Sequence, residues 1–145
     1  MPLMNAIIRT EENMNNITWK YVKPLADEKS IEDFEALVKI ELPKDLKDII
    51  LSANGGRPSL RYYDLATEKD KEFKSLLSFN RNDIENVFAF YPLESAIENL
   101  VPFATDPAGN LFVLNDGKIH LWLHEADKTI YLADSFTGFL GLLHE

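Results

Sequence analysis

The sequence predicts an α+β fold, in which N-terminal helices pack on a central, mainly antiparallel sheet and a C-terminal helix closes the domain. Three observations support this class. Two segments with helical apolar spacing lie before Gly56, several β-prone segments follow one another after residue 100, and an amphipathic segment ends the chain. A chain of 145 residues is expected to form one domain. We assign that domain to residues 17–145 and expect residues 1–16 to be an appended or poorly ordered lead.

The first element, residues 17–22, alternates along the chain and is either a short edge strand or an extended lead. A helix is expected over residues 30–39, because Ser30 and Asp33 resemble a capping box and apolar residues recur on one face. Pro43 suits the first turn of a second helix, which Asn54-Gly55-Gly56 ends. The expected buried stripe of that second helix consists of Leu46, Ile49 and Ile50.

The middle of the chain gives weaker signals. Residues 60–65 are expected to form a short strand, and the charged residues 68–74 a loop or one helical turn. Residues 87–91 are either a strand or the approach to a helix. Residues 92–100 carry one apolar stripe and are expected to form a third helix, with an acidic i, i+4 pair, Glu94 and Glu98, on its other side.

The strongest β signal is Asn115-Asp116-Gly117, which separates two β-prone segments, residues 111–114 and 118–123. An Asp-Gly pair in such a position is typical of a tight hairpin. A second turn around Asp127 leads into residues 129–133, so the sequence predicts a three-stranded antiparallel meander. Asp134-Ser135 then resembles the cap of a closing helix that extends to about Leu143.

The net charge of −9 is unevenly distributed. Residues 1–81 contain 13 Lys and Arg against 14 Asp and Glu, whereas residues 82–145 contain 2 Lys against 10 acids. This balance argues against direct nucleic-acid binding, which requires clustered basic side chains. The acidic half is either a solvated surface that favours solubility or a face for a basic partner.

Composition also excludes other classes of protein. The chain has no cysteine, so it forms no disulfide and no thiolate zinc site, which fits a reducing compartment, and we expect a cytoplasmic location. No segment approaches the roughly 18 apolar residues of a membrane helix, so no membrane association is expected. The N-terminus lacks the apolar region of a signal peptide, since Ala6-Ile7-Ile8 is followed by Arg9 and Glu11.

The histidines and turn residues give little support for a catalytic or metal-binding site. His120 and His124 lie on the same side of one predicted strand, about 13 Å apart, which is too far for one metal ion. They are expected to be ordinary side chains beside Trp122, with a partner contact as the alternative. Asp106 and Asn110 fit a turn better than a calcium loop. No known nucleophile or phosphate-loop pattern is present, so we predict no catalytic residue, no metal and no cofactor.

Three groups of residues, read together, resemble the SUKH superfamily, which includes fungal regulators of cell-wall glucan synthesis and many small bacterial proteins. The individual elements are short, but their order and spacing together are specific, and they span most of the chain. The first group lies in residues 19–24 and 31–43; the second is residues 46–50 with Asn54-Gly55-Gly56; the third is Val101-Pro102-Phe103-Ala104, Asp106, Gly109-Asn110, residues 119–122 and Ser135-Phe136 with Leu140.

This resemblance implies an α+β domain and, for bacterial members, an immunity protein that binds and neutralises a cognate polymorphic toxin, commonly a nuclease or another toxin that acts inside cells. It implies no catalytic residues. A basic nuclease groove would be complementary to the acidic half of this chain. The residues expected to contact such a partner are Glu94, Glu98, Asp106, Asp116, Trp122, His124, Glu125 and Asp127.

Two other functions remain open. One is a regulatory or scaffold domain for an endogenous partner, as in the fungal relatives. The other, less favoured, is a small-molecule-binding or hydrolytic domain with a pocket beside Trp122. The oligomeric state is expected to be a monomer or a homodimer, the latter formed through the first edge strand around Trp19.

Overall fold

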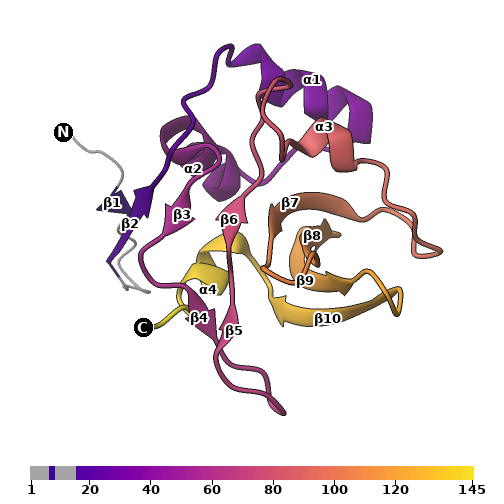
Figure 1. Ribbon diagram of the computed structural model, residues 1–145. Helices are drawn as coiled ribbons and strands as arrows, with labels where there is room; N and C mark the ends of the chain where they lie inside the picture. Colours follow the sequence, from indigo (N-terminus) through magenta and orange to yellow (C-terminus); the bar gives the residue numbers. More distant parts are fainter. Residues whose placement is uncertain (1–6, 9–15) are drawn as a thin grey trace.

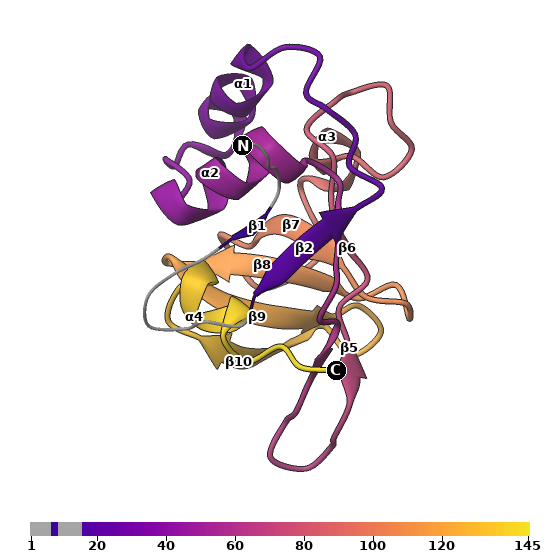
Figure 2. The same cartoon turned by 90° about the vertical axis from the view of Figure 1, so that its left-hand side faces the viewer.

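The computed structural model describes residues 7–8 and 16–145, so the expected N-terminal lead lies almost entirely outside the described residues. The described part has the predicted α+β class, although strands β1 and β2 precede the first helix. In Figure 2, α1, α2 and α3 lie above strands β7 to β10, whereas α4 lies lower, beside the sheet. The helices are α1 (Lys29–Val38), α2 (Lys44–Ala53), α3 (Val87–Phe90) and α4 (Phe136–Leu140).

The predicted meander is confirmed as part of a five-stranded antiparallel sheet of order β10-β9-β8-β7-β6. At the β8–β9 hairpin Asp116 and Gly117 both have positive φ, 55° and 78°, as a tight Asp-Gly turn requires. The sheet extends beyond the meander because two further strands pair onto it. Its strands are β6 (Ser75–Leu76), β7 (Val101–Thr105), β8 (Leu111–Asn115), β9 (Lys118–Leu123) and β10 (Lys128–Ala133).

The expectation of an edge strand near the N-terminus is wrong. Strand β2 (Ile17–Lys20) lies between β1 (Ile7–Ile8) and β3 (Arg57–Pro58). Trp19 is only 6% exposed, so the free edge on which we based a homodimer is already covered within the chain. The Leu76 N–H donates to the Gly56 carbonyl at 2.9 Å, which connects this small sheet to the larger one.

A short hairpin projects from the body of the protein, with the C-terminus beside it (Figures 1 and 2). It consists of β4 (Tyr62–Tyr63) and β5 (Lys71–Glu72). The β4 strand was predicted, but β5 lies where we expected a loop or a helical turn. The chain end joins the hairpin through two backbone hydrogen bonds between Tyr62 and His144, of 3.1 and 2.7 Å.

The third predicted helix, over residues 92–100, is absent; a single short helix, α3, precedes this segment. The physical reason is that its backbone is held from outside. The Ala96 N–H donates to the Asp127 carboxylate, 31 residues away, instead of to a helical carbonyl. Glu94 and Glu98 therefore do not form a helical i, i+4 pair.

The first two helices follow the predicted apolar pattern but not the predicted cap. Leu46, Ile49 and Ile50 are buried in α2 as expected, and Gly55 has a φ of 71° just beyond the end of the helix. Ser30 does not cap α1, since it lies inside the helix. Asp27 is the nearest polar partner, and its carboxylate accepts the Lys29 N–H at 2.9 Å.

Aromatic side chains fill the core between the helices and the sheet. Phe112 of β8 packs against Phe139 of α4, with ring centroids 5.5 Å apart, and against Phe73, at 4.8 Å. On the other side of the core, Phe34 of α1 contacts Phe79 and Phe88 edge-on. These rings position both helical layers relative to the sheet.

Candidate functional site

The segment of residues 91–100, which we call the acidic loop, is attached to the sheet by one carboxylate. Asp127 Oδ1 accepts hydrogen bonds from the Ser95 hydroxyl at 2.5 Å and from Trp122 Nε1 at 2.7 Å, and Asp127 Oδ2 accepts the Ala96 N–H at 2.8 Å. The hydrogen bonds from Ser95, Trp122 and Ala96, in that order of effect, lower the pKa of Asp127. The middle of the acidic loop is thus fixed beside the β9–β10 turn.

Both ends of the acidic loop lie near the β8–β9 turn. Asn99 and Asp116 line the same cavity, of about 320 Å³, together with the side chain of Tyr91 and apolar residues from α1, β7 and β8. The acidic loop therefore leaves the β8–β9 turn, reaches the β9–β10 turn at Ser95 and Ala96, and returns to the β8–β9 turn. Figure 1 shows this segment between α3 and β7, close to the β9–β10 hairpin.

This arrangement places four exposed carboxylates along one loop and two neighbouring turns. We call these residues the acidic surface: Glu94, Glu98, Asp116 and Glu125. Lys118 and Lys128, the only two Lys or Arg residues of the C-terminal half, are also exposed. Four of the eight residues predicted to contact a partner are thus exposed on this loop and these two turns.

Three other predicted contact residues are used by the fold. Asp106 is 6% exposed and accepts hydrogen bonds from the backbone of Ala108 and from both the backbone and the side chain of Asn110, at 2.8 to 3.1 Å. Trp122 is also 6% exposed, and its indole N–H is bonded to Asp127. Burial or internal hydrogen bonds thus occupy the side chains of Asp106, Trp122 and Asp127, and their contact with a partner stays a prediction. The buried indole likewise offers no open wall for the small-molecule pocket considered above.

His120 and His124 lie in different surroundings. The His120 ring contacts Tyr131 of β10 edge-on at 5.7 Å, and burial lowers the pKa of His120. His124 is exposed, with Nε2 3.3 Å from the Ala108 carbonyl oxygen and its N–H donating to the Asn110 side chain. His124 thus borders the turn at Asp106 and, of the two histidines, is the accessible one.

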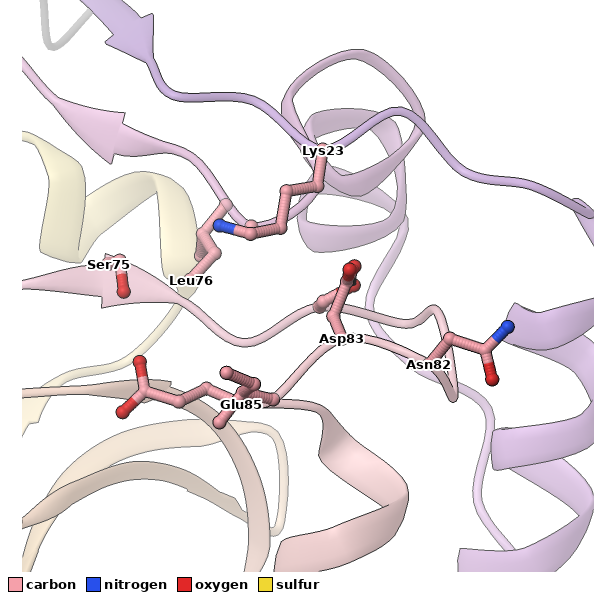
Figure 3. A pocket seen from close by; sticks show the side chains of 9 residues that line it. Lys23, Ser75, Leu76, Asn82, Asp83 and Glu85 are labelled. Carbon is pink, nitrogen blue, oxygen red and sulfur yellow. Dashed lines mark hydrogen bonds between the residues drawn. The ribbon is translucent and has the colours of Figure 1, made fainter.

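The sequence did not predict a groove that opens between the N-terminal segment and residues 75–85 (Figure 3). Its volume is about 450 Å³, and Lys23 lies across it from Asp83 and Glu85. Ile84, which also lines the groove, is 95% exposed. An exposed isoleucine beside mixed charges is a feature of protein-binding surfaces. No local pattern could have identified the groove, because its walls come from segments about 50 residues apart.

The floor of the groove is a fixed polar network. The Ser78 hydroxyl donates to Asp83 Oδ2 at 2.6 Å and accepts from Asn54 Nδ2 and the Asn80 N–H. Ser78 is 1% exposed, so its hydroxyl is unsuited to act as a nucleophile. The Asn54 side chain also binds the Lys23 carbonyl and the Phe79 N–H, and these bonds hold the two walls together.

Asp64, Asp70 and His144 form the group of side chains that could hold a metal ion in the described part of the chain. The pKa of His144 is raised by its hydrogen bonds to the Glu145 carbonyl and to Asp64. The pKa of Asp64 is lowered, mainly because it accepts the Asp70 N–H and also because it lies beside His144. This group was not predicted, because its members are up to 80 residues apart.

Comparison with known proteins adds one result. Residues 25–141 match the sequence model of the SMI1 / KNR4 family (SUKH-1), a stretch that begins just before α1 and ends just after α4. No curated protein matches the chain significantly. Among the described residues, no helix is both long and apolar enough to cross a membrane.

Proposed function

Because the chain belongs to the SMI1/KNR4 family (SUKH-1), we propose that it acts by binding another protein, as a cytoplasmic bacterial immunity protein that neutralises a cognate polymorphic toxin. The family includes both toxin-immunity proteins and fungal regulators. A protein that neutralises a toxin by covering its surface needs no catalytic residue. It needs only a face that is complementary to the toxin.

The acidic surface is the observation that carries the proposal. Glu94 and Glu98 project from a loop that Asp127 fixes to the sheet, so their backbone positions are set before any partner arrives. A preorganised face loses less conformational entropy on binding than a mobile one. A toxin that acts on nucleic acid must present basic side chains to phosphate, and carboxylates on a rigid face would compete for the same groove.

A second candidate function is regulation of an endogenous protein, as in the fungal members of the family. The groove beside Ile84 favours it, because this surface combines an exposed apolar side chain with charges of both signs. Such a surface suits a partner without a strong net charge. The two functions use different faces, the acidic surface or the groove.

Co-expression tests the proposed function directly. A toxin encoded beside this gene should arrest growth of a bacterial host when produced alone, and co-production of this protein should restore growth through a complex that co-purifies. A variant with Ile84→Asp should still protect if the acidic surface is the contact. Failure to protect against any neighbouring toxin candidate, with the protein folded and present, would reject the immunity function.

A further inference from the structure

We propose that Asp64, Asp70 and His144 bind one divalent transition-metal ion, with Zn²⁺ as the best match. The three side chains come from three segments that meet at the base of the projecting hairpin. Asp64 directly follows β4, Asp70 directly precedes β5, and His144 pairs with Tyr62 of β4. The site is therefore built by the fold and does not belong to the acidic surface or the groove.

The distances between the candidate ligand atoms are close to those of a metal site. His144 Nε2 lies 3.2 Å from Asp64 Oδ1 and 3.9 Å from Asp70 Oδ1, and one atom from each residue lies within 4.8 Å of the others. Two ligands at roughly 2.0 to 2.1 Å from a tetrahedral Zn²⁺ are about 3.4 Å apart. Binding one ion would shorten the longer of these separations by rotation of the side chains.

The imidazole of His144 is already oriented for coordination. Its Nδ1 donates to the backbone oxygen of Glu145 at 3.0 Å, which keeps a proton on that nitrogen. Without an ion, Nε2 donates to Asp64 Oδ1 at 3.2 Å, and a bound ion would take the place of the Nε2 proton. A histidine that binds metal in proteins usually donates its other ring N–H to such a carbonyl or carboxylate.

The Asp64 carboxylate is also oriented by a hydrogen bond. The Asp70 N–H donates to Asp64 Oδ1 at 2.9 Å, and the positive φ of Asp70, 55°, folds the loop back over Asp64. The cation closest to the pair is Lys69, whose Nζ is 3.9 Å from Asp64 Oδ2 and whose side chain is 76% exposed. A divalent ion would neutralise both carboxylates, whereas one imidazolium neutralises one.

A mixed set of one imidazole and two carboxylates selects the kind of ion. Imidazole nitrogen favours Zn²⁺ over Mg²⁺ and Ca²⁺, while carboxylate oxygen is accepted by Zn²⁺ as well. Three protein ligands leave at least one position for water. The bound ion would fasten the C-terminal segment, through His144, to the β4–β5 hairpin, so metal binding should protect that end of the chain from opening.

The test uses the full chain without a histidine tag, freed of metal by a chelator, and ZnCl₂ alone as the probe. Equilibrium dialysis should show one bound Zn²⁺ per chain, and the ¹⁵N resonance of His144 Nε2 should shift while that of Nδ1 changes little. His144→Gln and Asp70→Asn should each weaken binding by at least about tenfold. The NMR measurement is made on the wild-type protein, so it does not depend on the folding of a variant.

Matched controls come from the same protein. His124→Gln removes an exposed histidine elsewhere, and Glu68→Gln removes an acid from the same hairpin loop that is not in the cluster. Both controls should bind Zn²⁺ as the wild type does. Two results would overturn the proposal: no Zn²⁺ retained by the wild type, or equal loss of affinity in the control and cluster variants, which would indicate adventitious binding.

Discussion

Asp127 illustrates what one carboxylate can do when its position is set by a turn. It has a positive φ of 51°, which directs the chain from β9 into β10. Its two oxygens accept hydrogen bonds from Ser95, Ala96 and Trp122. These donors belong to the acidic loop and to β9, so the ionised side chain links a loop to a sheet. Hydrogen bonds to an ionised acceptor are stronger than those between neutral groups.

The first prediction concerns the pH dependence of this link. Because the folded pKa of Asp127 lies below its unfolded value of about 3.9, ionisation stabilises the fold above that pH, and the contribution is lost as pH falls through the folded pKa. Asp127→Asn should therefore be less stable than the wild type near pH 7, with a difference that narrows as the pH falls below about 4.

Urea unfolding followed by tryptophan fluorescence at several pH values measures this difference in the free energy of unfolding. Glu125→Gln, at an exposed position in the same turn, is the matched control and should follow the wild type. A stability difference for Asp127→Asn that stays constant from pH 7 to pH 2 would show that the carboxylate charge is not responsible.

The sequence shows which side chains could take part in a site, but it does not show which of them are exposed and which are used by the fold. Asp106, Asp127 and Glu125 all lie in or beside turns, and nothing local distinguishes them. The structure separates them because Asp127 meets Ser95, 32 residues away, and Asp106 is enclosed by its own turn and the sheet. The same reason hid the group formed by Asp64, Asp70 and His144, whose members approach only through the pairing of Tyr62 with His144.

At the scale of elements, α4 depends on its cap. It has only five residues, and the Ser135 hydroxyl accepts the Gly138 N–H at 2.9 Å. From the other side, Asp45 of α2 accepts both the N–H and the hydroxyl of Thr137 at 2.9 Å. A helix this short has little intrinsic stability, so its ends and its packing must maintain it.

We therefore predict that Ser135→Ala lowers the free energy of unfolding by about 1 kcal/mol, because the first turn loses its side-chain acceptor. Ser135→Asp should retain most of the stability, since a carboxylate accepts the same hydrogen bond. Chemical denaturation measures both effects. Ser52→Ala, at an exposed serine within α2, is the control and should change stability by a few tenths of a kcal/mol at most. An equally small effect of Ser135→Ala would rule out the capping role.

Elements with local signals were predicted, and elements defined by distant partners were not. The β8–β9 hairpin follows from Asp116-Gly117, and α2 from its apolar spacing and its glycine stop. Strands β5 and β6 have two residues each, and only pairing with β4 and β7 makes them strands. Residues 92–100 have helical spacing, yet bonds to Asp127 override that preference.

At the scale of the whole molecule, the two halves of the chain differ both in net charge and in the elements that they contribute. The N-terminal half is nearly neutral and contributes α1, α2 and the hairpin, whereas the C-terminal half carries most of the excess acid and four of the five strands of the larger sheet. The acidic surface lies on that sheet's connecting segments, while the core strands β7 and β8 are buried. Surface charge can therefore change without disturbing the packing of the sheet, which permits a charge-reversal experiment.

The last prediction tests whether this charge steers a partner. The double variant Glu94→Lys with Glu98→Lys should associate with the toxin, once co-expression has identified it, about ten times more slowly than the wild type at low salt. The reason is that electrostatic steering depends on complementary potentials. The dissociation rate should change less. Adding Glu125→Lys should increase the effect; Asp116 is left unchanged because its positive φ supports the hairpin.

Salt and a matched variant separate steering from damage to the fold. Near 1 M salt the screening length is about 3 Å, so wild-type and reversed proteins should associate at similar rates. Glu32→Lys with Asp33→Lys makes the same change in net charge at two exposed acids of α1 that do not belong to the acidic surface, and should slow association much less. Equal slowing by both double variants would mean that net charge alone matters, while no slowing at low salt would remove Glu94 and Glu98 from the interface.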